Sequence, residues 1–196
     1  MWTLPNLLSL ARIAVLPALI ALIWPGIEGR PACFWAAVIY ALASFTDAID
    51  GILARRLNKV TVLGKFLDPL ADKLFYLVPM VVLLQMDPAR IPLWIVLIVL
   101  VRELTITGLR AIAMSEGIVI AAGEGGKLKT FFGSIGMFAL LVHYPYLINF
   151  GVTTSVVDFH RLGLWITYLS VAFSLASAFE YLSHFLRSVK GTATSP

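Results

Sequence analysis

Six long apolar blocks separated by short polar connections constrain this chain more than any other feature. The blocks run approximately over residues 7–24, 34–54, 66–85, 93–114, 131–147 and 162–186. Crossing a hydrocarbon layer of roughly 30 Å takes about 20 apolar residues in a helix. Spanning helices also satisfy their backbone hydrogen bonds internally. The sequence therefore predicts an all-α integral membrane protein with six transmembrane helices.

The composition agrees with this prediction. Hydrophobic residues make up 60% and charged residues 13% of the 196 residues, against roughly 45–50% and 25% in soluble proteins. The net charge of +4 fits membrane topology and contact with membrane lipids better than nucleic-acid binding, which we do not expect. The single Cys33 supports no intrachain disulfide. We expect one domain over residues 1–190 and a flexible tail over 191–196.

The distribution of Lys and Arg predicts the orientation. Apart from Arg30, Arg90 and Arg161, the cations of the connections gather on the other side, at Arg55, Arg56, Lys59, Lys65, Lys127, Lys129, Arg187 and Lys190. Because cytoplasmic loops carry the excess of Lys and Arg, both termini should be cytoplasmic in a bacterial inner (cytoplasmic) membrane. The first block runs into Trp24-Pro25-Gly26 without a small-residue cleavage site, so we expect it to remain as the first span.

Four carboxylates lie inside the second and third apolar blocks. They are Asp47, Asp50, Asp68 and Asp72. An ionised Asp within a spanning helix costs about 2.5–3.5 kcal/mol, so such residues normally face a cavity or a ligand. The first pair shares a helix face with Ala54, and the second pair shares a face with Gly64. The short connection makes the two helices antiparallel neighbours, so the four carboxylates should converge at a polar cavity open to the cytoplasm.

This cluster predicts a site for two divalent ions. Clustered carboxylates repel one another unless they are neutralised, and Mg²⁺ or Mn²⁺ prefer oxygen ligands. A pair of ions can clamp the attacking and leaving oxygens in phosphoryl chemistry. Gly51, Ala54 and Gly64 leave space beside the helix backbone, and Arg55 offers a fixed cation for a phosphate oxygen.

Two other interpretations of the carboxylates stay open. They could be ordinary juxtamembrane charges, with Asp50 pairing with Arg55 or Asp72 with Lys73. They could also form a proton or cation pathway. The first interpretation does not explain four carboxylates on matched faces, and the second gives Arg55 and the small residues no role.

The same residues carry a known pattern. Asp47, Asp50-Gly51, Ala54-Arg55, Gly64, Asp68 and Asp72 match the motif of the CDP-alcohol phosphotransferases without departure in residue or spacing. That motif reads D, two residues, DG, two, AR, eight, G, three, D, three, D. The chain is therefore identified as a member of this family. The resemblance implies a six-helix enzyme, usually a homodimer, that releases CMP from a CDP-linked donor with the help of Mg²⁺ or Mn²⁺.

The resemblance also implies roles for single residues. Asp47, Asp50 and Asp68 would be the principal metal ligands, and Asp72 would be both a ligand of the second ion and the general base. The residues that would line the CDP site are Gly51, Ala54, Arg55 and Gly64, with Arg55 on the diphosphate. Asn6 would contact the nucleotide, although it could instead cap the first helix.

Further stretches in the first two thirds of the chain resemble the bacterial phosphatidylglycerophosphate synthases of this family. They are residues 4–8 leading to Arg12, 64–73, 102–110 and 126–130. This resemblance implies CDP-diacylglycerol as donor and sn-glycerol 3-phosphate as acceptor. Four cations on the side of the Asp cluster could bind the acceptor phosphate, namely Arg102, Arg110, Lys127 and Lys129.

Other assignments remain open at this point. Lys127 and Lys129 could face anionic lipid, and Arg102 could pair with Glu103 or with a motif carboxylate. Sister enzymes that use inositol phosphate, serine or phosphatidylglycerol are alternatives in function, and a cation transporter or structural membrane protein is a distant one. The connection over residues 148–161 should lie on the opposite side and be dispensable for the chemistry.

Overall fold

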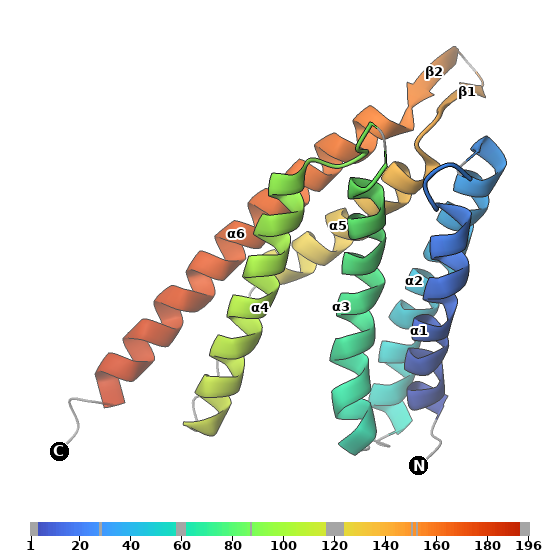
Figure 1. Ribbon diagram of the computed structural model, residues 1–196. Coiled ribbons are helices and arrows are strands. Elements are labelled where there is room, and N and C mark those ends of the chain that lie inside the picture. Colours follow the sequence, from blue (N-terminus) through green and yellow to red (C-terminus); the bar gives the residue numbers. More distant parts are fainter. Residues whose placement is uncertain are drawn as a thin grey trace. The chain divides into compact units, whose positions relative to one another are not determined.

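The structure, a computed structural model, consists of helices and one hairpin (Figure 1). It describes residues 4–27, 29–57, 62–86, 88–116, 124–149, 151 and 153–192. The elements are α1 (Leu4–Leu22), α2 (Arg30–Leu57), α3 (Val62–Leu84), α4 (Leu93–Ser115), α5 (Glu124–Val142), β1 (Pro145–Asn149), β2 (Thr154–Asp158) and α6 (Phe159–Thr192). A helix forms in each of the six apolar blocks, so the prediction of six helices is confirmed.

Membrane association is supported most directly by α6. Its stretch Phe159–Ser188, with a mean hydropathy of 1.6, is the one helix in the described part of the chain that is long and apolar enough to cross a membrane. A shorter apolar helix covers Asn6–Leu22. The 23-residue α4 is as long as a span but carries Arg102, Glu103 and Arg110. Crossing of the membrane by all six helices therefore stays a prediction.

Large apolar side chains are exposed along most of the helices. Phe45 of α2, Phe66 of α3 and Phe179 of α6 are each more than 60% exposed. Such surfaces are unfavourable in water and fit a lipid environment.

The end of the fifth helix differs from the prediction. We expected helix to residue 147, whereas α5 ends at Val142 and residues 145–149 form β1. His143 adopts a left-handed backbone with φ of 60°. Proline disfavours helical backbone in the residue before it, so Pro145 prevents Tyr144 from continuing the helix. The prediction of helix up to residue 147 was therefore wrong, and the 148–161 connection contains most of an unpredicted hairpin.

The hairpin is a regular antiparallel pair that leads into α6. Its register runs from Pro145 opposite Asp158 to Asn149 opposite Thr154. The Asp158 carboxylate accepts a hydrogen bond from the backbone N–H of Arg161 at 3.1 Å. Asp158 therefore acts as the N-cap of α6.

The chain divides into two compact units, each of which is described by itself. One comprises Met1–Pro92 and Met137–Leu164, and the other Leu93–Gly136 and Trp165–Pro196. In the first unit α1 packs against both α2 and α3, and the rings of Tyr40 and Phe75 stack with centroids 4.7 Å apart. The single domain expected over residues 1–190 stays a prediction.

In the second unit α5 and α6 approach each other through small residues. A Cβ atom on Gly125 would lie 3.2 Å from Ser177 Cβ, and one on Gly136 would lie 2.6 Å from Thr167 Oγ1. The rings of Phe132 and Phe173 stack beside this contact at 5.5 Å. Small residues at such positions are typical of closely packed membrane helices.

Candidate active site

The eight motif residues lie on two consecutive helices of the first unit. Asp47, Asp50, Gly51, Ala54 and Arg55 belong to the last turns of α2, while Gly64, Asp68 and Asp72 belong to the first turns of α3. The side chains of residues 47–57 lie outside the described part of the structure. The predicted ligand and CDP contacts of the α2 residues therefore lie outside it as well.

Helix α1 contacts the two motif carboxylates of α3. Ser9 Oγ donates a hydrogen bond to Asp68 Oδ1 at 2.5 Å, and Arg12 Nη1 forms an ion pair with Asp72 Oδ1. Ser9 and Arg12 are buried, whereas Asp68 is exposed and the Asp72 side chain is 57% exposed. Both carboxylates are thus oriented from one side and remain accessible from the other.

Asn6 completes a polar stripe on α1. Asn6, Ser9 and Arg12 follow at steps of three residues, which places neighbours in this series on adjacent positions of the helix surface, and all three are buried. Because α1 begins at Leu4, Asn6 lies within the helix. The alternative that it caps the first helix is wrong, and its contact with the nucleotide stays a prediction.

The donor chemistry of Asp68 and Asp72 fits a hard divalent ion. Both offer accessible carboxylate oxygens, the ligand type that Mg²⁺ and Mn²⁺ prefer. Within the described residues, however, no group of three or more His, Cys, Asp or Glu side chains could hold a metal ion. A complete ligand set would need the carboxylates of α2, whose side chains lie outside those residues.

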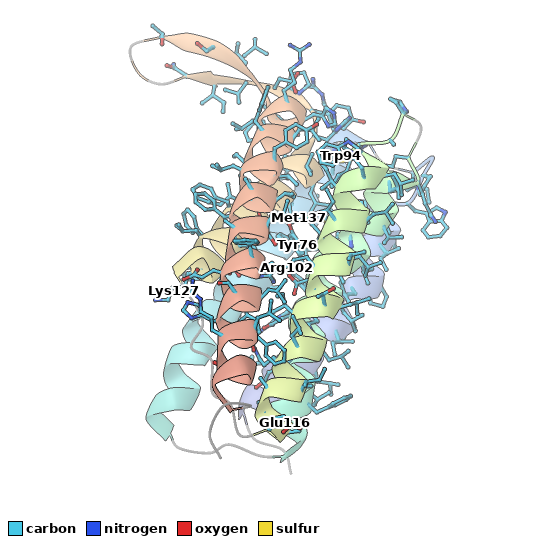
Figure 2. All side chains as sticks on the ribbon, turned by 90° about the vertical axis from the view of Figure 1, so that its left-hand side faces the viewer. Tyr76, Trp94, Arg102, Glu116, Lys127 and Met137 are labelled. Atoms are coloured by element: carbon cyan, nitrogen blue, oxygen red, sulfur yellow. The ribbon has the colours of Figure 1, made fainter. Side chains whose placement is uncertain are left out.

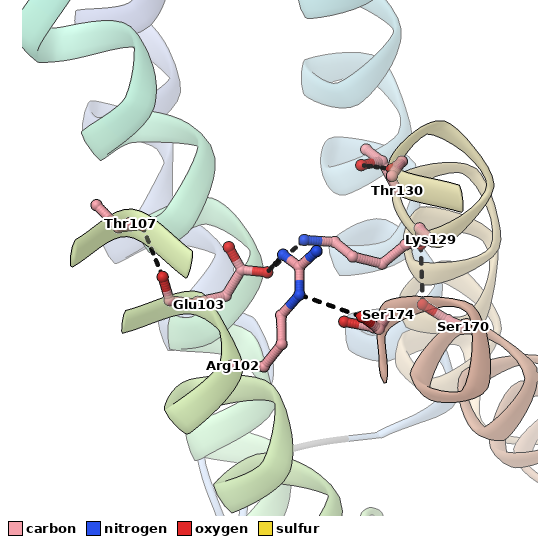
Figure 3. A network of polar contacts seen from close by, with 8 residues as sticks. Arg102, Glu103, Thr107, Lys129, Thr130, Ser170 and Ser174 are labelled. Carbon is pink, nitrogen blue, oxygen red and sulfur yellow. Dashed lines mark hydrogen bonds and ion pairs between the residues drawn. The ribbon is translucent and has the colours of Figure 1, made fainter. Parts of the chain in front are cut away.

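In the second unit, two of the predicted acceptor-binding cations meet on a single carboxylate (Figure 3). Arg102 Nη1 lies 2.9 Å from Glu103 Oε1, and Lys129 Nζ pairs with the same oxygen. The side chains of Arg102, Glu103 and Lys129 are 11%, 15% and 19% exposed, respectively. The pairing of Arg102 with Glu103 confirms one of the alternatives left open by the sequence.

Hydrogen bonds to backbone carbonyls extend this network to α6 (Figure 3). Arg102 Nε donates to the carbonyl oxygen of Ser174 at 3.3 Å. Ser170 Oγ donates to the carbonyl oxygen of Lys129 at 2.9 Å. The network therefore links α4, α5 and α6 through charged and hydroxyl groups.

The two other predicted cations lie elsewhere in the second unit. Lys127 is exposed on α5 (Figure 2). The Arg110 guanidinium carbon lies 5.9 Å from the centre of the Tyr181 ring, at cation–π distance. The structure brings together Arg102 and Lys129, and the participation of Arg110 and Lys127 stays a prediction.

Sequence reasoning missed Ser9 and Arg12 as partners of the motif carboxylates. It also treated Glu103 only as a structural partner of Arg102. A signal existed for two of these residues, because Arg12 and Glu103 are charges within apolar blocks. Ser9 gave no such signal, since a serine is common in membrane helices.

Comparison with known proteins decides the family. The family model described as CDP-alcohol phosphatidyltransferase matches residues 2–176, which include both the aspartate motif and the Glu103 network. The chain belongs to the CDP-alcohol phosphatidyltransferase family. The match extends past the first two thirds of the chain, which contain the stretches that resembled the family in sequence.

The relatives described here are bacterial proteins. A Bacillus subtilis protein named CDP-diacylglycerol--glycerol-3-phosphate 3-phosphatidyltransferase is 40% identical over 193 residues, covering 93% of this chain and 95% of its own. A Rickettsia typhi protein of the same name is 34% identical over 92% and 96% of the two chains. A Mycobacterium tuberculosis protein named probable phosphatidylglycerophosphate synthase is 32% identical over 96% and 84%. These names describe enzymes, and they give no support to the transporter alternative.

Proposed function

We propose that this chain transfers the phosphatidyl group of CDP-diacylglycerol to sn-glycerol 3-phosphate, giving phosphatidylglycerophosphate and CMP. The observation that carries the proposal is the Bacillus subtilis relative, which is 40% identical over nearly the whole of both chains and is named for this reaction. The complete aspartate motif on α2 and α3 supports the same class of chemistry.

Two ions, Mg²⁺ or Mn²⁺, would be held by Asp47, Asp50, Asp68 and Asp72. When bound, such ions offset the negative charge of the diphosphate and of the departing CMP. The accessibility of Asp68 and Asp72 supports this role. Beside them, the CDP-lipid is bound by Asn6, Gly51, Ala54, Arg55 and Gly64, with Arg55 on the diphosphate.

Asp72 acts as the general base. It accepts the proton of the acceptor hydroxyl, whose oxygen forms a bond to the phosphorus that carries diacylglycerol, while the bond from that phosphorus to the CMP oxygen breaks. Arg12 supports this role because its buried guanidinium fixes the orientation of the carboxylate. The 57% exposure of Asp72 leaves the carboxylate open to substrate.

The phosphate of the acceptor is bound by Arg102 and Lys129, with Arg110 and Lys127 contributing further positive charge. Guanidinium and ammonium groups form short, charge-assisted hydrogen bonds to phosphate. The meeting of Arg102 and Lys129 on one carboxylate supports this assignment, since a phosphate could be shared by the same two groups.

Phosphatidylglycerol is a second candidate acceptor. A Streptomyces coelicolor relative named cardiolipin synthase (CMP-forming) is 35% identical over 147 residues, 74% of this chain and 65% of its own. Its smaller coverage makes it the weaker candidate. In either case the enzyme works in a bacterial inner membrane as a homodimer, with both termini and the active site on the cytoplasmic side.

The test is CMP release from CDP-diacylglycerol in detergent micelles with Mg²⁺ or Mn²⁺. Glycerol 3-phosphate, phosphatidylglycerol, serine and inositol 1-phosphate are offered separately. We expect release with glycerol 3-phosphate alone. Release with another acceptor alone would replace the proposed acceptor, and no release with any of them would refute the proposed reaction.

A further inference from the structure

Glu103 is the only acidic residue of α4, and it lies in the middle of an apolar helix. Its side chain is 15% exposed, and in the described part of the chain both of its ionic partners reach the same atom, Oε1. Arg102 comes from the same helix and Lys129 from α5 (Figure 3). One carboxylate oxygen therefore sets the separation of two cations on different helices.

The charges explain why a carboxylate is needed there. Two cations held this close repel each other strongly where water is scarce. Adjacent residues on a helix do not face each other, so Arg102 has to fold back toward Glu103 to make its 2.9 Å contact. Without the negative charge, both cations would move apart toward more polar surroundings.

Arg102 keeps donors for a further ligand. A guanidinium carries five N–H groups. One of these, on Nε, is used on the Ser174 carbonyl and one, on Nη1, on Glu103. Within the described residues no contact uses Nη2 of Arg102, so a phosphate could bind without displacing either contact.

Contacts with α6 hold the backbone of Lys129 in place. Ser170 Oγ, on the buried face of α6, donates to the Lys129 carbonyl oxygen at 2.9 Å. The close approach of Gly125 to Ser177 fixes the same segment of α5 against α6. Both cations are therefore preorganised before any acceptor arrives, which reduces the entropy lost on binding.

Resting on the proposed function, we infer that Glu103 is a positioning residue for the acceptor phosphate. It holds the Arg102 guanidinium and the Lys129 ammonium on one oxygen, so that both cations meet the same phosphate group. Glu103 does not touch the acceptor, because two anions would repel each other. It acts on acceptor affinity through the geometry of the two cations.

The test compares the wild type with Glu103→Gln, Glu103→Asp and Glu116→Gln in the CMP-release assay. Each substrate is varied at a saturating concentration of the other. Glutamine keeps the shape of Glu103 and one acceptor oxygen but lacks the charge. The matched control, Glu116, is an exposed carboxylate just beyond the end of α4 (Figure 2).

We expect Glu103→Gln to raise the KM for glycerol 3-phosphate by about tenfold, as the loss of one charge-assisted contact would. The KM for CDP-diacylglycerol should not change. Glu103→Asp keeps the charge with a shorter reach, so its KM for glycerol 3-phosphate should fall between those of the wild type and Glu103→Gln. Glu116→Gln should match the wild type.

Other outcomes overturn the inference. Equal changes in both KM values would indicate a structural role, and a lower KM for glycerol 3-phosphate would mean that Glu103 competes with the phosphate. If Glu103→Gln does not fold, Glu103→Asp decides, because an unchanged KM for glycerol 3-phosphate in that variant refutes positioning. If the wild type is inactive with glycerol 3-phosphate, the proposed function itself is refuted. If the wild type is active and Glu103→Gln has an unchanged KM for glycerol 3-phosphate, only this inference is refuted.

Discussion

At the residue scale, the candidate site depends on buried polar groups that orient exposed carboxylates. Ser9 and Arg12 are buried, while their partners Asp68 and Asp72 are exposed. A buried polar group costs free energy unless it is hydrogen-bonded. Ser9 and Arg12 are therefore stabilised by the motif, and they hold its carboxylates in fixed orientations in return.

The replacement Asp72→Asn tests the proposed base. The amide cannot accept the hydroxyl proton, and it is a poorer metal ligand than a carboxylate. We expect kcat for CMP release to fall by about 10²–10⁴-fold, the usual contribution of a general base. The protein should remain folded, because the amide oxygen can still accept a hydrogen bond from Arg12.

The matched control is Asp158→Asn in the same unit. Asp158 is 43% exposed at the start of α6, and asparagine is as good an N-cap as aspartate. Its kcat and unfolding midpoint should equal those of the wild type. The assignment of Asp72 is wrong if Asp72→Asn retains wild-type turnover, or if Asp158→Asn loses as much.

At the element scale, hydropathy was sufficient to find all six helices but not their ends. The fifth helix was extended five residues too far because residues 146–148 are as apolar as the block before them. Only local backbone effects at His143 and Pro145 separate helix from strand there. Short apolar runs give no periodicity that distinguishes the two.

For the candidate site, the sequence predicted which helices carry the aspartates but not which residues contact them. The sequence placed the aspartates on two consecutive helices, and their backbone lies on α2 and α3 as predicted. The convergence of the four carboxylates stays a prediction. Their partners are distant in the chain, because Ser9 lies 59 residues before Asp68 and Arg12 lies 60 residues before Asp72. Contacts over such separations depend on how α1 packs against α3, which the pattern of one helix does not reveal.

The substitution Gly163→Ala tests the packing of α5 against the start of α6. A Cβ atom there would lie 2.7 Å from the backbone nitrogen of Leu140, which cannot move alone. We expect Gly163→Ala to destabilise the protein by about 1–3 kcal/mol, as overpacking does, and to lower the unfolding midpoint measured in detergent.

The control for this prediction is Gly108→Ala on α4, where nothing lies within 4 Å of the added Cβ. Alanine in a helix interior is favoured over glycine by up to about 1 kcal/mol, so this variant should be as stable as the wild type or slightly more stable. Equal midpoints for the two variants would show that α5 and α6 do not pack as described.

At the scale of the whole molecule, the asymmetry of Lys and Arg predicts the orientation in the membrane. The hairpin should face away from the cytoplasm, and the end of α4 should face toward it. Replacing the buried Cys33 by Ser gives a background for labelling with an impermeant maleimide. In that background, Ser155→Cys should react in intact cells and Glu116→Cys only after permeabilisation.

Both labelling positions are exposed, so access to reagent depends on the side of the membrane alone. The reverse pattern would invert the topology and place the aspartates on the outer side. Labelling of both positions in intact cells would contradict a multi-pass arrangement in which they lie on opposite sides.

The proposed reaction is the transfer of a phosphatidyl group to glycerol 3-phosphate. Its most direct test is the incorporation of radiolabelled glycerol 3-phosphate into extractable lipid by the purified protein, measured together with CMP release. We expect one labelled lipid molecule for each CMP released. CMP release without label in the lipid would reveal a hydrolase, and label in neither fraction would contradict the proposed reaction.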